Sequence, residues 1–473
     1  MLPGLIDAHA HAGHALVKTL GCGDGRRRVS DWARACHELY TVGSTEGFWE
    51  AEAELCALER LKVRRRPAPV VRRRTARTAD APCAAFASHQ FGITTGVSVL
   101  GGGDMVFRTD DARYGVAHCR GVARVGTKSV VAVGANRPSA MVPIDADTPR
   151  AEWVYAHVDE ADGKERVTET KVDADSQLRV CEELIRRCHG AEEFRGRVRI
   201  AMCPPVHDPR GALPEAVSLE EVLAAAARHR ALANEHEGVT FTQDGHTGGS
   251  IAFAEAHGLL DGSASFLSHC TDLEPEDIDA LRRSGAAVVH NPSASWSIAG
   301  YCPVPALLDA GVTVAIGSDG TSPNRSTDLF RHMQQCMHYH RRQHRDPQMI
   351  PPGKALEMCT IDSARALGVA HEVGSLEPGK RADIVLVNLA APHIAPLRSM
   401  PLEHAVCYAN GSDVDTVIVD GEVLMRARRV LSVNEADVIE RASNEAESAV
   451  RRCGLEPLRG RRPGFWGCSR WAA

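Results

Sequence analysis

The chain has 473 residues, of which 44% are hydrophobic, 25% charged and 5% aromatic, the composition of an ordinary soluble globular protein. Its 55 Lys and Arg residues against 61 Asp and Glu residues give a net charge of −6, so no chain-wide attraction to nucleic acid or to an anionic membrane is expected. No stretch approaches the roughly 20 apolar residues that span a bilayer. The 15 cysteines form no CxxC pair and the N-terminus lacks the apolar run of a signal peptide, which together predict a cytoplasmic protein.

Short β-branched runs alternate with longer helical runs over residues 1–367. Helices are predicted over Leu219 to Asn234 and Glu274 to Ser284, the second with acids at its start. Repeated βα units of this kind predict a (β/α)8 barrel, an α/β fold with a parallel sheet. The eight candidate strands are Gly4 to Ala8, Gly92 to Leu100, Ser129 to Gly134, Val198 to Met202, Val239 to Thr242, Ser265 to Ser268, Ala287 to His290 and Val312 to Gly317.

Three other segments complete the predicted organisation. Residues 63–90 form an Arg-rich insertion into the barrel, which we interpret as a solvated segment without a function of its own. Residues 368–432 contain short strands such as Asp383 to Val387 and Val417 to Gly421, broken by Gly and Asp, and predict a small β domain. Residues 433–473 predict a helix, from Glu435 to Arg452, and a tail.

The first candidate site lies at the end of the first predicted strand, in Asp7-Ala8-His9-Ala10-His11. Side chains alternate along a strand, so His9 and His11 face the same way. An inward-facing pair at the carboxyl end of a barrel strand can bind one metal ion. Two histidines at this spacing are weak evidence alone in a chain with 22 histidines.

Two further side chains follow apolar strands of the predicted barrel. His269 follows Phe266-Leu267-Ser268, and Asp319 follows Val314 to Ser318. Barrel active sites form at this end of the strands, so four potential ligands converge on one rim. Histidine nitrogen and carboxylate oxygen suit a divalent transition metal, zinc or alternatively iron, whose bound water has a pKa of roughly 7. Asp319 would both ligate the metal and accept the proton of that water.

Six motifs in order, from residue 3 to about 430, resemble the amidohydrolase superfamily, and most closely its chlorohydrolase and aminoheterocycle deaminase branch. They are Pro3-Gly4-Leu5-Ile6-Asp7-Ala8-His9-Ala10-His11, Gly92-Ile93-Thr94-Thr95, Ser268-His269-Cys270, Val289-His290-Asn291-Pro292-Ser293, Gly317-Ser318-Asp319 and Gly374-Ser375-Leu376-Glu377-Pro378-Gly379-Lys380-Arg381-Ala382-Asp383. The resemblance implies a distorted barrel with one catalytic metal.

The resemblance carries His9, His11, His269 and Asp319 over as metal ligands. His290 matches the strand-seven histidine, which in the family contacts the metal-bound hydroxide or the polar edge of the substrate, and we expect it to stabilise the tetrahedral adduct. Either role gives it a place in catalysis; the alternative is a histidine buried at a strand end.

The fifth strand departs from the family pattern. The family shows His-x-x-Glu there, whereas this chain reads Val239-Thr240-Phe241-Thr242-Gln243-Asp244-Gly245-His246, with no glutamate. We predict His246 as the remaining metal ligand and Asp244 as the residue that inherits the acid/base task, both reaching the rim through the flexible Gly245. The proton transfer to the leaving group is the weakest step of this hypothesis.

Substrate contacts are predicted for His207 and Trp296, which follow the fourth and seventh strands, because rim loops are where a planar heterocycle is stacked and hydrogen-bonded. A Trp that only packs the loop is the alternative. Family members carry some tens of residues before the first strand, whereas Met1 falls almost at the barrel here, so we expect either a truncated N-terminus or strands that close on themselves. An incomplete β domain with exposed strand edges predicts association, such as a homo-oligomer.

These observations predict a metal-dependent hydrolase acting on C–N bonds other than peptide bonds. The first choice of reaction is hydrolytic deamination of an aminated nitrogen heterocycle of the purine, pterin, pyrimidine or triazine type, a small-molecule substrate. Opening of a cyclic amide or displacement of halide at the same site is the alternative, mildly favoured by the missing glutamate. A silent scaffold of the same fold has no need of four converging ligands.

Overall fold

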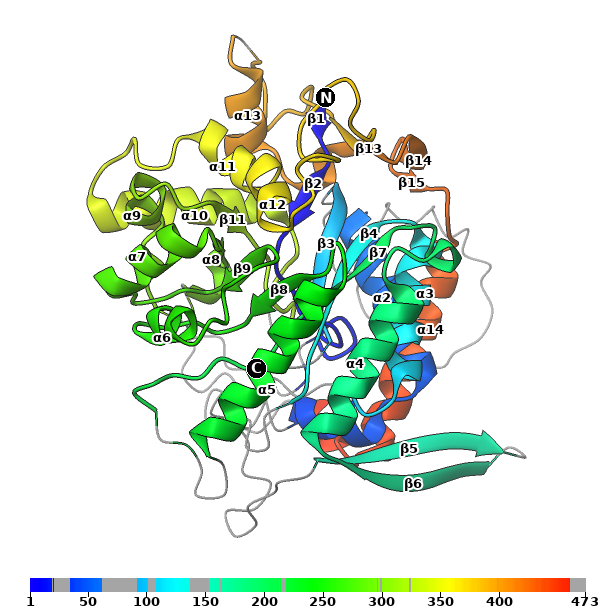
Figure 1. Ribbon diagram of the computed structural model, residues 1–473. Helices are drawn as coiled ribbons and strands as arrows, with labels where there is room; N and C mark the ends of the chain where they lie inside the picture. Colours follow the sequence, from blue (N-terminus) through cyan, green and yellow to red (C-terminus); the bar gives the residue numbers. More distant parts are fainter. Residues whose placement is uncertain are drawn as a thin grey trace, which may run out of the picture.

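Eight parallel strands form a nearly closed barrel in the computed structural model (Figure 1). The strands pair in the order β11 (Val314–Ile316), β10 (Ala287–His290), β9 (Ser265–Ser268), β8 (Thr240–Gln243), β7 (Val198–Met202), β4 (Lys128–Val133), β3 (Ile93–Val99) and β2 (Leu5–Asp7). The model describes residues 1–18, 20, 35–61, 92–100, 108–136, 153–161, 164–211, 213, 218–295, 297, 300–322, 325–397 and 399–459. The predicted barrel and its eight strands are confirmed.

The first and last barrel strands approach each other at their carboxyl ends. The backbone N–H of Ala8 donates to the carbonyl of Ile316 at 3.1 Å, and the N–H of Asp319 donates to the carbonyl of His9 at 2.9 Å. These bonds lie just beyond β2 and β11, where the candidate site residues begin. The seam of the barrel therefore brings His9 and Asp319 together.

Helices surround the barrel, and local sequence signals set several of their ends. The helix α5 begins after Ser218, which forms a capping box with Glu221, and α7 begins with Pro275 and ends at Gly285 in a left-handed conformation. The helices around the barrel are α2 (Glu46–Leu61), α3 (Ala112–Val125), α4 (Ala174–Cys188), α5 (Leu219–Glu235), α6 (Ser250–Ala256), α7 (Pro275–Ser284), α8 (Pro292–Ala294), α9 (Val304–Asp309), α10 (Leu329–His344), α11 (Pro352–Met358) and α12 (Ile361–Ala366), with short turns η1 (Leu39–Gly43) and η2 (Glu192–Phe194).

The hydrophobic core has two layers, and the alternation of side chains along the strands separates them. Ala287 and Val289 of β10 belong to the cluster inside the barrel, with Phe266 and Ala315 of the neighbouring strands. Val288, between them, belongs to the layer that packs under the surrounding helices. A strand residue's parity therefore decides whether it faces the barrel interior or the helices.

A separate antiparallel sheet packs at one end of the barrel. Its order is β1 (Leu2–Pro3), β12 (Ile384–Val387), β13 (Val414–Val419), β14 (Glu422–Arg426) and β15 (Arg429–Val430). The predicted strands near 383–387 and 417–421 are confirmed, but residues 2 and 3 also join this sheet, Leu2 opposite Val385 and Pro3 opposite Ile384. The helix α13 (Pro401–Tyr408) and the turn η4 (Gly411–Asp413) lie in the connection between β12 and β13.

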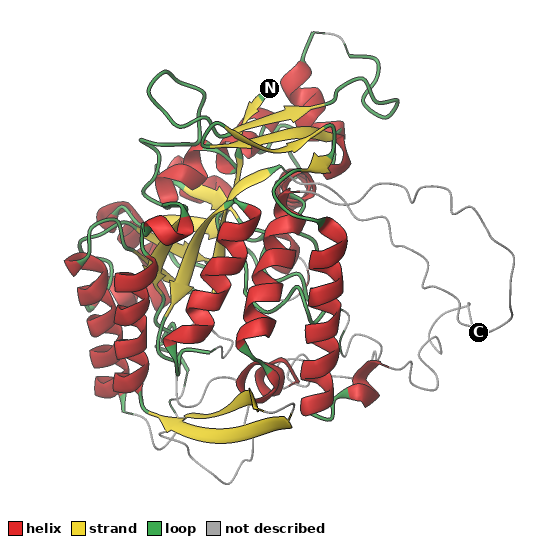
Figure 2. Ribbon diagram, turned by 90° about the vertical axis from the view of Figure 1, so that its right-hand side faces the viewer, coloured by secondary structure: helices red, strands yellow, loops and turns green. Residues whose placement is uncertain are grey.

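Two elements lie outside the barrel repeat. The helix α14 (Glu435–Arg452), followed by η5 (Glu456–Arg459), matches the predicted helix at both ends and packs against α2, with an ion pair from Arg441 to Glu54 at 2.5 Å. The hairpin of β5 (Trp153–Ala161) and β6 (Lys164–Val172) was not predicted; it lies at the end of the molecule opposite the five-stranded sheet (Figures 1 and 2). The predicted insertion at 63–90 lies outside the described residues. None of the helices that the structure describes has both the length and the apolar character needed to cross a membrane.

Candidate active site

His9 and His11 lie side by side just after β2. The chain stays extended there because Ala12 donates to Val99 and Val99 donates to Ala10. The imidazole rings have centroids 4.9 Å apart at an interplanar angle of 87°, and both side chains are buried. The structure thus places both histidines on one side of the chain, as the period of two predicts.

Two aspartates approach this pair of rings. The His11 Nε2 atom lies 3.0 Å from Oδ1 of Asp319 and 3.4 Å from Oδ2 of Asp244. The His9 Nε2 atom lies 3.3 Å from Oδ1 of Asp244 and 3.9 Å from Oδ1 of Asp319. Asp244 follows β8 and Asp319 follows β11. Together with the histidine pair after β2 and with His269 after β9, they bring side chains from four strand ends to the rim.

His269, after β9, closes the cluster. Its Nε2 atom lies 3.3 Å from Oδ1 of Asp244, and its ring centroid is 5.7 Å from that of His9. Both His269 and Asp319 have left-handed backbones, with φ of 67° and 62°. Such backbones are uncommon outside glycine and gather at functional sites, where the surrounding structure maintains the strain. Backbone hydrogen bonds from His269 to Val289 and from Asp319 to His9 hold both turns.

The electrostatics of the cluster favour a cation. Burial raises the pKa of Asp244, but the charges of His9, His11 and His269 outweigh it and lower the pKa below its usual range. Burial lowers the pKa of His9 to about 4, against the opposing attraction of Asp244 and Asp319. His11 is also buried, yet the two carboxylates raise its pKa. A buried place where a positive charge is stabilised in this way suits a metal ion.

Two side chains orient the carboxylates of the cluster, and a third supports the neighbouring carboxylate of Asp7. Arg325 Nη1 lies 3.2 Å from Oδ2 of Asp319. Burial raises the pKa of Asp319, but the charge of Arg325 together with the contacts to His11 and His269 outweighs burial and lowers this pKa well below its usual value. Ser268 donates from its hydroxyl to Oδ1 of Asp244 at 2.5 Å. Ser318 donates to Asp7, at the end of β2. Hydrogen-bonded supports of this kind fix ligand orientation in metal sites.

The strand-five position is filled differently from the prediction. Asp244 lies in the cluster, whereas His246 is placed away from it, with Nδ1 2.9 Å from the hydroxyl of Ser250. The reason is the backbone: β8 ends at Gln243, and Gly245 has φ of 94°, so the alternation that would align His246 with Asp244 is broken. Of the two residues, the structure brings Asp244 within 3.4 Å of the imidazoles of His9, His11 and His269.

His290 is also placed away from the predicted position. It follows Val289, which points into the barrel, so its side chain faces the outer layer and the helix α10. Among the described residues neither ring nitrogen of His290 has a hydrogen-bond partner. The structure therefore places the His290 side chain beside His340 of α10, while the catalytic role predicted for it stays a prediction.

The two predicted substrate contacts have different outcomes. His207 lies near His246, beside a small pocket between β8 and the helices α5 and α6, with its ring 5.0 Å from that of Phe253. That pocket does not include the residues of the cluster. Trp296 lies outside the described residues.

Sequence reasoning missed His14 and Arg325. The ring of His14 stacks on that of His11 at 5.1 Å, and a Cβ atom on Gly320 would meet His14 Nδ1 at 1.9 Å, so only glycine fits beside Asp319. The spacing His-x-His-x-x-His was a signal for His14. Arg325 carried no local signal, because it reaches Asp319 through a turn held by its bond to the Gly320 carbonyl at 2.8 Å.

The fold and the site together define a (β/α)8 barrel with a histidine and aspartate cluster able to hold a metal ion at its rim. A family model described as the Amidohydrolase family matches residues 1–424. The chain belongs to the amidohydrolase family, as the motifs indicated.

Curated relatives share part of the chain. It is 36% identical over 269 residues to a 5-methylthioadenosine/S-adenosylhomocysteine deaminase of Desulforudis audaxviator (strain MP104C), a match covering 57% of this chain and 62% of that protein. It is 34% identical over 277 residues to a 5'-deoxyadenosine deaminase of Methanothermobacter thermautotrophicus (strain Delta H), with the same two coverages. The chain thus spans less than two thirds of the length of these relatives.

Solved structures share the fold over nearly the whole chain. An adenosine deaminase from Xanthomonas campestris with bound zinc has a TM-score of 0.62 at 19% identity, covering 95% of this chain and 86% of that one. An atrazine chlorohydrolase from Arthrobacter aurescens TC1, complexed with zinc, has a TM-score of 0.64 at 19% identity, covering 94% and 88%. At this identity the likeness establishes the architecture.

Proposed function

We propose that the chain is a metal-dependent hydrolase that removes the exocyclic amino group of an aminated nitrogen heterocycle, with adenine nucleosides altered at the 5′ position as the first substrate class. The observation that carries this proposal is the convergence of three imidazoles and two carboxylates at the barrel rim. The names of the relatives, deaminases of 5-methylthioadenosine and 5'-deoxyadenosine, support the substrate class.

The residues present fit a divalent metal ion. The Nδ1 atom of His9 has no hydrogen-bond partner among the described residues, and Nε2 faces carboxylate oxygens of Asp244 and Asp319 at 3.3 and 3.9 Å without a hydrogen bond, although the side chain is only 1% exposed. Buried polar atoms without partners are rare and call for an explanation, and an ion beside them provides one. Imidazole nitrogen with carboxylate oxygen is a donor set for zinc. The ligands we propose are His9, His11, Asp244, His269 and Asp319.

A zinc ion bound there would supply Lewis-acid activation of a water molecule. In the proposed reaction that water adds to the ring carbon bearing the amino group, the C–N bond breaks, ammonia leaves and a carbonyl remains. Asp319 is the residue we propose to take the proton of the water. Arg325 and the N–H of Gly320, which donates to Asp319 Oδ1 at 2.7 Å, hold its carboxylate in place.

Release of ammonia needs a proton for the departing nitrogen, and this step gives a second candidate function. Asp244, predicted for that task, contacts three imidazoles and the hydroxyl of Ser268 and is engaged as a ligand in the proposed site. No glutamate occurs between residues 239 and 246. Displacement of halide needs no such proton, so a halide-displacing hydrolase is the second candidate. Opening of a cyclic amide stands beside it as the other reaction at the same site, although its ring nitrogen also gains a proton when the C–N bond breaks.

A substrate screen on metal-defined protein tests the proposal. The full chain is stripped with chelator, reloaded with zinc and assayed for ammonia release from adenosine, 5'-deoxyadenosine and 5-methylthioadenosine. An aminopterin, an aminotriazine, a chlorotriazine and a cyclic amide are assayed beside them. Zinc-dependent ammonia release from the nucleosides supports the proposal. Chloride release or ring opening without ammonia supports the second candidate, and no zinc-dependent turnover on the panel contradicts both.

A further inference from the structure

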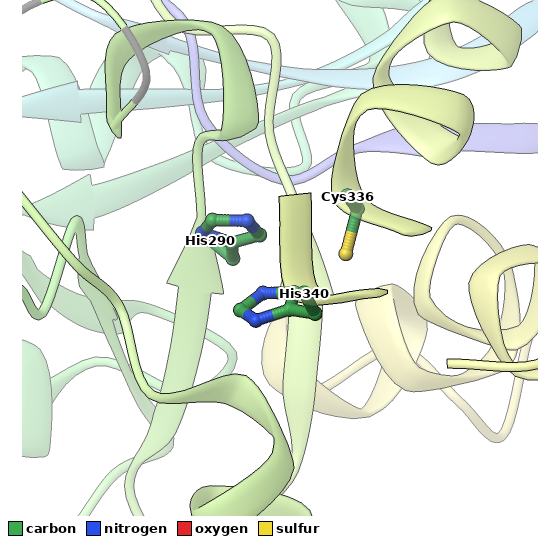
Figure 3. Close-up of side chains that lie close together, drawn as sticks. All are labelled: His290, Cys336 and His340. Carbon is green, nitrogen blue, oxygen red and sulfur yellow. The ribbon is translucent and has the colours of Figure 1, made fainter. Parts of the chain in front are cut away.

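A second cluster of metal-ligating side chains lies behind the rim, between β10 and α10. It consists of His290, at the end of β10, and of Cys336 and His340 on α10 (Figure 3). All three side chains are fully buried, and one ligand atom from each lies within 4.8 Å of the others. We propose that this cluster binds a second metal ion of the zinc type, distinct from the ion of the active site.

The fold explains why these residues meet. Cys336 and His340 are four residues apart on α10, so they lie one above the other on a single helix face. His290 is two residues after Val288 on β10, so both side chains point to the same face of the strand, out of the barrel and toward the helices. The rings of His290 and His340 have centroids 5.4 Å apart.

The polar atoms of the cluster lack partners. All four ring nitrogens of His290 and His340 are buried without a hydrogen bond to any described residue. Two neighbouring imidazoles in this condition are unusual in a native core, where buried polar groups are nearly always paired. A thiol beside them cannot satisfy four nitrogens, because sulfur is a weak donor and a weak acceptor. A metal ion would engage one nitrogen of each ring and the sulfur at the same time.

The donor set identifies the class of ion. Two imidazoles and a thiolate favour zinc over hard ions such as magnesium or calcium. Bond lengths of about 2.0–2.1 Å to nitrogen and about 2.3 Å to sulfur place tetrahedral ligand atoms roughly 3.3–3.6 Å apart. Closure from separations of at most 4.8 Å needs a movement of about an ångström or less, within reach of side-chain rotation. The fourth position would be taken by water, since no other described His, Cys, Asp or Glu belongs to the group.

The place of the cluster indicates a structural role. The carbonyl of His290 accepts a hydrogen bond from the N–H of Gly317 at 2.9 Å, two residues before Asp319. An ion held by His290 and α10 would therefore join the end of β10 to the surrounding helix layer, on the outer face of the barrel. It would lie next to the strand ends that carry His269 and Asp319. The tyrosines Tyr301 and Tyr339 cover His340, with ring centroids 5.8 and 5.1 Å away.

Cobalt(II) distinguishes the two sites because only one of them contains sulfur. Metal-free full-length protein is titrated with Co²⁺, and the thiolate-to-cobalt charge-transfer absorption in the near ultraviolet is recorded. We expect two equivalents to bind, one of them with this band. Cys336→Ser should lose the band and one equivalent. His9→Ala should lose one equivalent but keep the band, so failure of the active-site proposal does not affect this readout.

The matched control is Cys181→Ser, another fully buried helical cysteine, which should keep the band and both equivalents. His340→Gln serves as a second variant in case Cys336→Ser does not fold, and its melting temperature should rise less on addition of zinc than that of the wild type. A folded wild type that shows no thiolate band with Co²⁺, or a band that persists in folded Cys336→Ser, overturns the proposal.

Discussion

The buried carboxylate of Asp7 accepts two hydrogen bonds from Ser318, one from the backbone N–H at 2.8 Å and one from the hydroxyl at 2.7 Å. Asp7 lies at the end of the first barrel strand and Ser318 directly before Asp319. Burial, the largest influence, raises the pKa of Asp7, while the Arg60 guanidinium and the two bonds from Ser318 oppose it. The hydrogen bonds between Asp7 and Ser318 thus join the first and the last barrel strand, next to the proposed metal ligands.

We expect Ser318→Ala to weaken metal binding while leaving the barrel folded. Loss of the hydroxyl leaves one oxygen of a buried carboxylate short of a partner, at a cost of about 1–3 kcal/mol. The lost hydrogen bond would loosen the turn at Ser318 and so the position of Asp319, which follows it directly. Zinc affinity, measured by competition with a chromophoric chelator, should fall about tenfold or more. Ser284→Ala should bind zinc as the wild type does, because the Ser284 hydroxyl bonds locally, to the carbonyls of Ala280 and Leu281 and to the N–H of Ala286.

The proposed ligands predict that His9→Ala and Asp319→Asn each abolish zinc-dependent turnover, by at least 100-fold in kcat/KM. Each variant removes one donor from a single ion, and the remaining donors hold it too weakly. Elemental analysis should show the loss of one equivalent of metal in both. Asp362→Asn is the control, because Asp362 is a buried, ion-paired aspartate of α12. Full activity in both ligand variants would exclude the proposed site.

The choice between Asp244 and His246 as the strand-five ligand can be tested directly. Asp244→Asn should lose zinc and activity, because Asp244 lies within 3.4 Å of three imidazoles. His246→Gln should keep the metal content, because the bond from His246 to Ser250 can be made by an amide. Metal analysis of the two purified variants decides the question, and the opposite result would restore the ligand that the sequence predicted.

Arg325 is expected to position Asp319 rather than to contact the substrate's reacting atoms. Arg325→Lys keeps a charge but loses the bond that the guanidinium makes to the Gly320 carbonyl, since the two side chains differ in donor geometry. We expect kcat to fall about tenfold with a small change in KM. Because Arg325 lowers the pKa of Asp319, the acidic limb of the pH–rate profile should move to higher pH in Arg325→Gln. An unchanged profile in that variant would contradict the positioning role.

Buried neutral histidines predict loss of stability in mild acid. Burial lowers the pKa of His229 to about 4, and its ring donates from Nδ1 to Ala225 and accepts at Nε2 from Ala135. The unfolded chain binds this proton near pH 6.5, so stability is lost as pH falls from 6.5 toward 4, by up to about 3 kcal/mol. Urea unfolding of metal-free protein at pH 7 and pH 5 measures the effect. His229→Gln should have a smaller difference between the two pH values than wild type.

Most of the barrel could be predicted because its strands are short apolar runs separated by helices with clear start signals. The helix Glu435–Arg452 was predicted at both ends from its spacing alone. The hairpin of β5 and β6 was missed because it is added outside the βα repeat. Pairing of Leu2 and Pro3 with β12 was missed because two residues carry no periodicity, and their partners lie far along the chain.

The site shows where local patterns stop being informative. The period of two placed His9 and His11 together, since the backbone stays extended between them. It did not place His246, because the positive φ of Gly245 ends the alternation. It also did not show which alternate residues of β10 face the barrel interior. His290 was therefore expected inside the barrel, whereas its side chain lies under α10. Tertiary contacts such as Arg325 with Asp319 leave no trace in the neighbouring sequence.

The strand β1 has a mechanical consequence. Leu2 and Pro3 pair with β12 in the small sheet, and Gly4 alone separates them from β2, the strand that leads into His9 and His11. A movement of that sheet relative to the barrel would therefore displace β2 along the strand direction, and His9 would move with it. The pairing of β1 with β12 thus restricts the movement of His9 and His11 relative to the rest of the rim.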